Sequence, residues 1–223
     1  MQNYLYRLFT DMDGQLFRIQ KAEDIQKVWK ASLLLFLASI AIYFWMAWLG
    51  MGTNLISQEF TSTTPDVYNA YKLWFIMGRA LFAILLAVII LYLTSFYFYL
   101  FTKIRYKKLV IMQQVVLMMM LFERLLWIPL FVYLGLDWYV SPFSLGIITS
   151  YFTQHEWFLY FFGSITIIQI WIIAFQAKYL SRLSPMKIWK IWTLVIIWHL
   201  ISYLIVATLG YFDEQLLVRW FES

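Results

Sequence analysis

The stretch "LVIMQQVVLMMMLFERLLWIPLFVYL" (Leu109–Leu134) is apolar along most of its length and carries one adjacent pair of charges, Glu123 and Arg124. At about 1.5 Å per residue, a helix of this length exceeds the roughly 30 Å hydrocarbon core of a bilayer. The stretch therefore predicts a transmembrane helix. Charged side chains at membrane depth are costly and usually face the interior of a helix bundle, so this pair requires a partner or a function.

The composition extends this prediction to the whole chain. Of its 223 residues, 63% are hydrophobic and 13% are charged, whereas a soluble domain is about half apolar and about a quarter charged. The chain contains no cysteine, which excludes a disulfide framework, a thiolate metal site and a cysteine nucleophile. We therefore expect an all-α integral membrane protein.

Five segments are apolar and long enough to span a membrane, and they predict a polytopic transmembrane helical bundle over residues 31–212. A shorter apolar patch within "DWYVSPFSLGIITSYFTQHE" (residues 137–156) predicts an interfacial or re-entrant segment. Residues 213–223 are the predicted external C-terminal tail. The five predicted spans are Ala31–Gly50, Leu73–Thr102, Leu109–Leu134, Trp157–Ser181 and Ile188–Phe212.

The basic residues indicate the orientation of the bundle. Three groups of Lys and Arg fall on one side of the predicted membrane, whereas Lys72 and Arg219 fall on the other. Because cytoplasmic loops are enriched in Lys and Arg, this pattern predicts a cytoplasmic N-terminus and a C-terminus outside. It also explains the net charge of +5 without a nucleic-acid partner. The three groups are Arg7, Arg18, Lys21, Lys27 and Lys30; Lys103, Arg105, Lys107 and Lys108; and Lys178, Arg182, Lys187 and Lys190.

Residues 1–30 carry an apolar stripe at helical spacing, with charged residues off the stripe. This pattern predicts an amphipathic helix in the inner headgroup layer. The alternative is a short helix packed under the bundle, and Gly14 is a point at which the helix could divide. The stripe consists of Leu5, Leu8, Phe9, Met12, Leu16 and Ile19.

Arg79 and Glu123 lie at matching depths in the second and third predicted spans, each roughly 9 Å from the outer edge of the hydrocarbon core. Arg79 shares a helix face with Ala83 and Ala87, and small residues allow helices to approach closely. We therefore predict an intramembrane ion pair between Arg79 and Glu123. Such a pair is either structural or part of a gate or relay, because charges inside a membrane often mark functional paths.

Two neighbours of Glu123 complete this prediction. Arg124 points about 100° away from Glu123 on the helix, so we expect it to extend outward over Trp127. Pro129 removes one backbone hydrogen bond and is a candidate helix hinge.

The other polar residues predicted inside the bundle are neutral. In the fourth span, Gly163, Thr166, Gln169 and Gln176 form one small and polar stripe. In the fifth, His199 and Ser202 share a face. These residues predict interhelical hydrogen bonds, and the alternative is a proton-linked role for His199. The polar interior is thus predicted to contain Arg124, Gln169, Gln176, His199 and Ser202.

The sequence "KIRYKK" places Lys103, Arg105, Lys107 and Lys108 next to a span. Such a cluster is a candidate contact for anionic lipid headgroups, and the alternative is that it serves only to set the topology. No nucleophile constellation, glycine-rich phosphate loop or pair of catalytic carboxylates can be assembled from the chain. We therefore expect no enzyme activity, no cofactor and no metal site.

The last two predicted spans, "FLYFFGSITIIQIWIIAFQAKYLSRLSPMKIWKIWTLVIIW" (Phe158–Trp198), pair a helix carrying a late Ile-Trp with a short "LSRLSPMK" turn and a second Trp-rich helix. This arrangement resembles the Yip (Ypt-interacting protein) family of five-span membrane proteins. The resemblance implies a non-enzymatic protein that works through partners, and for the bacterial members it implies association with ABC-type exporters in the inner membrane. The family offers no catalytic residues to carry over.

Two functions are therefore expected as alternatives. The first is an accessory or adaptor protein of a membrane complex that contacts lipids and an ABC exporter subunit or a second copy of itself. The second is a small transporter or translocation-path subunit, in which Arg79, Glu123 and His199 line a polar cavity.

Overall fold

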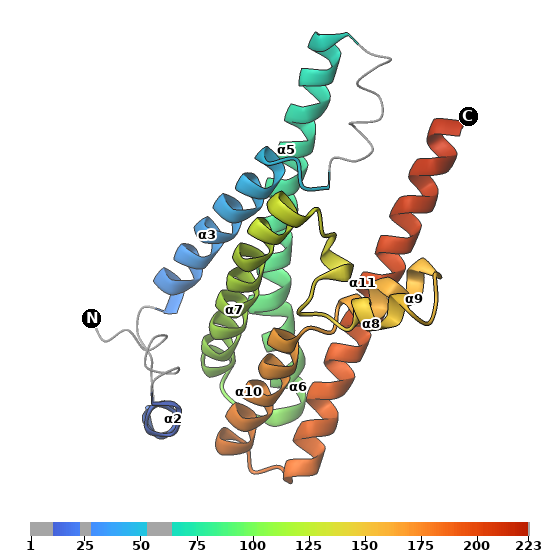
Figure 1. Cartoon of the computed structure of the whole chain (residues 1–223). Helices are drawn as coiled ribbons and strands as arrows, with labels where there is room; N and C mark the ends of the chain where they lie inside the picture. The colour runs from blue at the N-terminus through green and yellow to red at the C-terminus, as the bar shows by residue number, and fades with distance from the viewer. Residues whose placement is uncertain (1–10, 23–27, 53–63, 223) are drawn as a thin grey trace.

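The structure is a computed structural model of the whole chain, and it describes residues 11–22, 28–52 and 64–222, with side chains up to Phe212. These residues form helices and connecting turns (Figure 1). In chain order the helices are α2 (Met12–Lys21), α3 (Val28–Trp48), α5 (Pro65–Val88), the π-helical turn η2 (Ile89–Leu93), α6 (Thr94–Thr102), α7 (Tyr106–Leu134), the 3-10 turn η3 (Trp138–Val140), α8 (Gly146–Ser150), α9 (Glu156–Gly163), α10 (Ile167–Leu183) and α11 (Ile188–Glu222).

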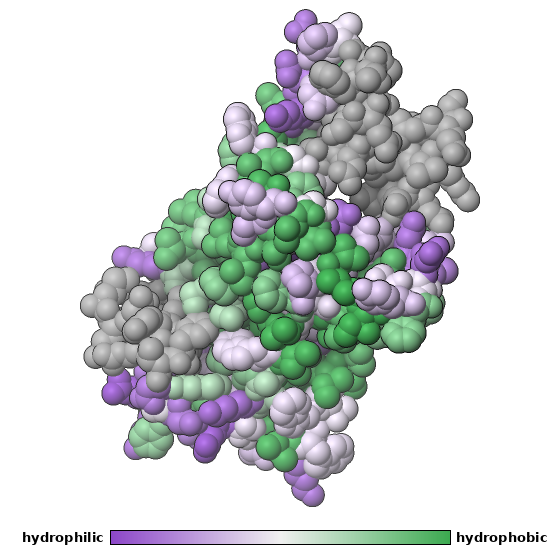
Figure 2. Space-filling view, in the orientation of Figure 1, coloured by the Kyte–Doolittle hydropathy of each residue, from purple (hydrophilic) through white to green (hydrophobic). Residues whose placement is uncertain are grey.

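Four helical stretches are long and apolar enough to cross a membrane: Val28–Trp48, Pro65–Thr102, Tyr106–Leu134 and Ile188–Phe212. They match the first, second, third and fifth predicted spans, which confirms the helical membrane character of the chain. Hydrophobic residues cover the middle of the face seen in Figure 2, and hydrophilic residues gather toward its two ends. The last helix continues to Glu222, so residues 213–222 of the predicted tail are helical in their backbone.

The fourth predicted span, Trp157–Ser181, is not one continuous helix. Helix α9 ends at Gly163 and α10 begins at Ile167. Thr166 has an extended backbone, and its side chain accepts a hydrogen bond from the Gln169 amide at 3.1 Å. A threonine that caps a new helix in this way competes with continuation of the old one. The fourth predicted span is therefore divided into two helices, and five spans are not confirmed.

The backbone at this break is paired with the chain segment that precedes α8. The Leu145 amide donates to the Ile165 carbonyl at 3.1 Å, and the Ile167 amide donates to the Phe143 carbonyl at 3.0 Å. In a membrane, irregular backbone is tolerated only where protein supplies the missing hydrogen bonds. The segment predicted to be interfacial or re-entrant therefore provides the partners that let α9 and α10 separate.

Helix α7 is the central element of the bundle. All of its residues from Leu109 to Leu117 are buried, as expected for a helix surrounded by others. It packs against α3 on one side and against α6, η2 and α10 on the others, while α9 and α10 both pack against α11. Three parts of the chain lie at one end of the bundle, which we call the basic end: α2, the α6–α7 turn and the α10–α11 turn (Figure 1).

Helix α2 packs under the bundle at the basic end. Leu16 and Ile19 are 2% and 4% exposed and belong to the main hydrophobic core. Gly14 does not divide the helix, because it lies in the first turn, where its amide donates to the Asp11 carboxylate at 3.1 Å. These residues show the second arrangement expected from the sequence, a helix packed under the bundle. The apolar positions Leu5, Leu8 and Phe9 lie outside the described residues.

Burial rather than charge is expected to hold α2 in place. Asp13 lies 3.2 Å from the Lys178 ammonium and 3.7 Å from the Arg182 guanidinium, but its side chain is 63% exposed. Exposed ion pairs contribute about 0–1 kcal/mol, whereas truncation of a buried leucine costs about 2–5 kcal/mol. Leu16→Ala should therefore accelerate amide hydrogen exchange of α2 far more than Asp13→Asn. Phe17→Ala is the control because Phe17 is 56% exposed; equal acceleration by Phe17→Ala and Leu16→Ala would contradict this account.

Candidate functional site: a buried polar chain and a basic pocket

Four polar side chains from α7, α10 and α11 form a chain inside the bundle. The Gln176 amide nitrogen donates to Oε1 of Gln113 at 3.3 Å, and His199 Nε2 lies 2.9 Å from Oε1 of Gln176. The Tyr203 hydroxyl lies 3.4 Å from His199 Nδ1. Each of these side chains is less than 9% exposed, so every hydrogen bond in the chain replaces contacts with water that the side chains have lost.

The contacts assign one donor-to-acceptor direction to this row of hydrogen-bonded side chains. Oε1 of Gln176 can only accept, so His199 carries its proton on Nε2 and donates it there. His199 Nδ1 then accepts from the Tyr203 hydroxyl, and Gln176 donates onward to Gln113. The chain ends at the Gln113 amide nitrogen, which is buried and has no hydrogen-bond partner among the residues that the structure describes.

The next residue of α7 makes the opposite connection. Gln114 donates from Nε2 to the Val28 carbonyl at 2.8 Å and to the Ser32 hydroxyl at 2.9 Å, both on α3. Consecutive helix residues point about 100° apart, so two adjacent glutamines reach different neighbours. Gln113 and Gln114 thus connect the central helix to α10 on one side and to α3 on another.

Glu123 and Arg124 lie farther along α7 and are half-buried. The Arg124 guanidinium lies near the Tyr43 hydroxyl of α3. The Arg124 guanidinium carbon lies 5.9 Å from the centroid of the Trp127 ring, the neighbour expected from the sequence. Arg124 therefore faces α3 as well as Trp127, rather than simply extending outward.

Arg79 has different neighbours from Glu123. Its Nη2 lies 3.4 Å from the Met51 carbonyl, and its guanidinium carbon lies 5.1 Å from the centroid of the Phe75 ring. Within the described ranges, ion pairs closer than 4 Å join Asp13 to Lys178 and Arg182, and the predicted Arg79–Glu123 pair is not among them. The physical reason is that α5 packs mainly on α3, so equal depth does not bring Arg79 to α7.

The remaining predicted residues take local roles. Ser202 donates to the Trp198 carbonyl of its own helix at 2.9 Å. Gln169 is buried, and its backbone amide binds the capping Thr166. Pro129 is exposed, and α7 continues through it to Leu134.

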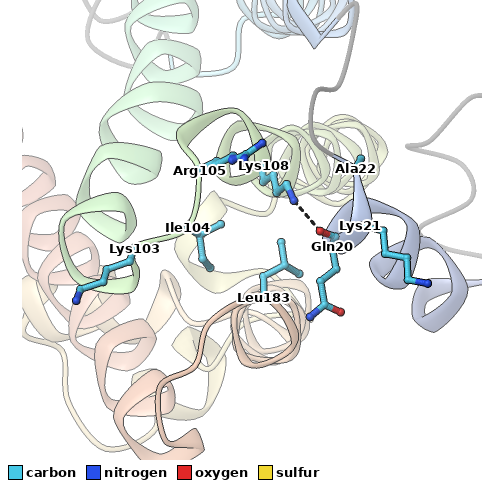
Figure 3. Close-up of a pocket in the computed structure, with 8 residues that line it drawn as sticks. All are labelled: Gln20, Lys21, Ala22, Lys103, Ile104, Arg105, Lys108 and Leu183. Carbon is cyan, nitrogen blue, oxygen red and sulfur yellow. Dashed lines mark hydrogen bonds between the residues drawn. The ribbon is translucent and has the colours of Figure 1, made fainter.

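A pocket of about 250 Å³ opens at the basic end between α2, the α6–α7 turn and the end of α10. Lys21, Lys103, Arg105 and Lys108 line it, together with Gln20 and Leu183. The Lys108 ammonium donates to the Gln20 backbone carbonyl at 2.9 Å (Figure 3). Three of the four bases come from the cluster that the sequence singled out, and Lys21 is added by the packing of α2.

Sequence reasoning missed Gln113, Tyr203 and Tyr43. The "QQ" pair in a predicted span was a visible signal, because polar residues inside spans tend to face other helices. Nothing in the sequence stated which helix each glutamine faces. No three His, Cys, Asp or Glu side chains of the described residues gather as a metal-binding group. Compared with protein-family models, curated proteins and solved structures, the chain gives no match.

Proposed function

We propose that this protein is a non-enzymatic accessory or adaptor protein of a membrane complex, acting through its helix surfaces and its basic loops. One observation carries the proposal: the polar side chains inside the bundle bind one another. Gln113, Gln176, His199 and Tyr203 fill their shared interior as a connected chain. Hydrogen bonds between helices in the interior stiffen the bundle. Contacts with other molecules are then made by the outer faces of the helices and by the basic end.

The partner class follows from the resemblance to the Yip family, which indicates an ABC-type exporter subunit in a bacterial inner membrane. The proposed orientation has a cytoplasmic N-terminus and an external C-terminus. It is supported by the basic residues at the α6–α7 and α10–α11 turns, since positive residues favour the cytoplasmic side.

The test is affinity purification of the tagged protein from its own membranes in mild detergent, with brief crosslinking and mass spectrometry. We expect one membrane protein to accompany it in a fixed ratio and to crosslink through specific lysines. A useful control is an unrelated membrane protein carrying the same tag at similar abundance. Recovery of the protein alone, or with the same background as the control, would contradict the adaptor proposal.

A second candidate is a small transporter or translocation-path subunit. The observation that favours it is the hydrogen-bonded chain of side chains that runs from Tyr203 to the Gln113 amide, with the half-buried Glu123 farther along α7. Chains of titratable and polar groups are typical of proton-linked transporters. Proton flux into liposomes that contain the protein should then be lost in the Glu123→Gln and His199→Gln variants and retained in the Ser202→Ala variant. Without flux by the unaltered protein, this candidate fails.

A further inference from the structure

Basic residues are concentrated at the start of helix α7. The N-terminus of a helix carries partial positive charge and favours acidic residues. Helix α7 instead begins with Arg105 at its N-cap and Lys107 and Lys108 in its first turn, and this turn contains no acidic residue. Basic side chains therefore gather where the backbone N–H groups of a helix N-terminus also favour an anion.

The α6–α7 turn holds these bases in a constrained shape. Lys103 has φ of 56°, the one positive φ at a non-glycine residue in the described part of the chain. A left-handed conformation at such a residue is uncommon and is retained where the surroundings require it. The turn presents Lys103 and Arg105 at the pocket, with Ile104 between them, 6% exposed and belonging to the main core.

The pocket has the chemistry of an anion site with an apolar edge. Among the described residues that line it, four are basic and none is acidic. Lys108 uses one of its three donors on the Gln20 carbonyl, so two remain for an anion. Figure 3 shows Lys103 and Lys21 at opposite edges of the pocket with their flexible stems turned outward, and Leu183 along one wall.

The position of the pocket suggests where the anion comes from. It lies between the end of the apolar stretch Pro65–Thr102 and the start of Tyr106–Leu134. Helices of this kind end at the level of the lipid headgroups, where anionic lipids attract basic residues.

We propose that this pocket binds a phosphate group, supplied by an anionic phospholipid of the adjacent leaflet. Arg105 and Lys108 hold the phosphate beside the first turn of α7, and Ile104 and Leu183 contact the start of the lipid's apolar part. Because α2 contributes Gln20 and Lys21, the bound lipid also fastens α2 to the bundle. The free phosphate ion shares this chemistry and is the other possible source.

The test uses the full-length protein in mild detergent. Native mass spectrometry measures retained phospholipid, and thermal unfolding is followed as phosphatidylglycerol, phosphatidylcholine or inorganic phosphate is added. Each basic residue near an anionic lipid contributes about fivefold in affinity, so Arg105→Gln with Lys108→Gln should weaken phosphatidylglycerol binding by about 25-fold. Lys187→Gln with Lys190→Gln is the matched control. It removes the same charge at the same end of the bundle, outside the pocket, and should have little effect.

The outcomes separate the sources. Stabilisation by phosphatidylglycerol alone supports a lipid site. Saturable displacement of that lipid by inorganic phosphate supports the same pocket as a site that binds the phosphate group, whether free or in a lipid. Equal losses in the pocket and control variants, or unchanged retention in both, would overturn the proposal. Lys108→Arg keeps the charge and should retain binding that Lys108→Gln loses, which provides a test even if the double variant fails to fold.

Discussion

Gly163→Ala is expected to destabilise the folded protein by about 1–3 kcal/mol, which is the usual cost of forcing an extra methyl group into a packed site. A Cβ atom at Gly163 would lie 2.7 Å from both Cα and Cβ of Tyr139. The first of these is a backbone atom, so rotation of a side chain cannot relieve the clash. The expected fall in the midpoint of thermal unfolding, measured on detergent-solubilised protein, is roughly 2–12 °C for a chain of this size.

The surroundings explain why this glycine matters. Tyr139 packs edge-on against Tyr160, with ring centroids 5.0 Å apart, and its carbonyl accepts a hydrogen bond from the Ser144 hydroxyl at 3.2 Å. Gly146 approaches the same carbonyl closely. Moving Tyr139 would therefore disturb the segment that supplies hydrogen bonds to the break between α9 and α10.

The matched control is Gly78→Ala. A Cβ atom at Gly78 meets nothing within 4 Å, and Gly78 lies inside α5, where alanine is favoured over glycine by about 1 kcal/mol. The midpoint of Gly78→Ala should be unchanged or raised. If the midpoint of Gly78→Ala fell as far as that of Gly163→Ala, the loss in Gly163→Ala could not be attributed to the Tyr139 contact.

Gln176→Leu is expected to cost about 1–3 kcal/mol of folding free energy. The substitution keeps a similar volume but removes two interhelical hydrogen bonds, leaving the His199 Nε2 proton and Oε1 of Gln113 without their partners. Hydrogen bonds between membrane helices average about 0.6 kcal/mol and reach about 1.7 kcal/mol. Unfolding in a denaturing detergent, followed by tryptophan fluorescence, measures the loss.

A double-mutant cycle with His199→Leu makes this prediction sharper. Because the two side chains act through one hydrogen bond, the double variant should lose less stability than the sum of the single variants, by about 0.5 kcal/mol or more. Ser202→Ala is the control because its hydroxyl binds only its own helix, and it should change stability little. Strictly additive losses for Gln176 and His199 would show that their contact carries no energy.

Part of the fold could be predicted from composition and hydropathy. The apolar runs that became Val28–Trp48, Pro65–Thr102, Tyr106–Leu134 and Ile188–Phe212 were recognisable because a helix must be about twenty apolar residues long to cross a bilayer. The break inside Trp157–Ser181 was not, because the run stays apolar while Thr166 caps a new helix. That cap depends on backbone pairing with Phe143 and Leu145, which are distant in sequence.

The candidate site was likewise predictable only in part from the sequence. The sequence by itself determined that the chain is a helical membrane protein, that Gln176 and His199 stand among apolar residues, and that basic residues cluster at Lys103–Lys108. It could also give the depth of Arg79 and Glu123, because depth follows from counting residues along a helix. Only the tertiary structure decided which side chains meet, since rotation of each helix about its axis is set by packing against neighbours. Packing directed Arg79 toward Met51, Gln114 toward Ser32, and Gln113 toward Gln176.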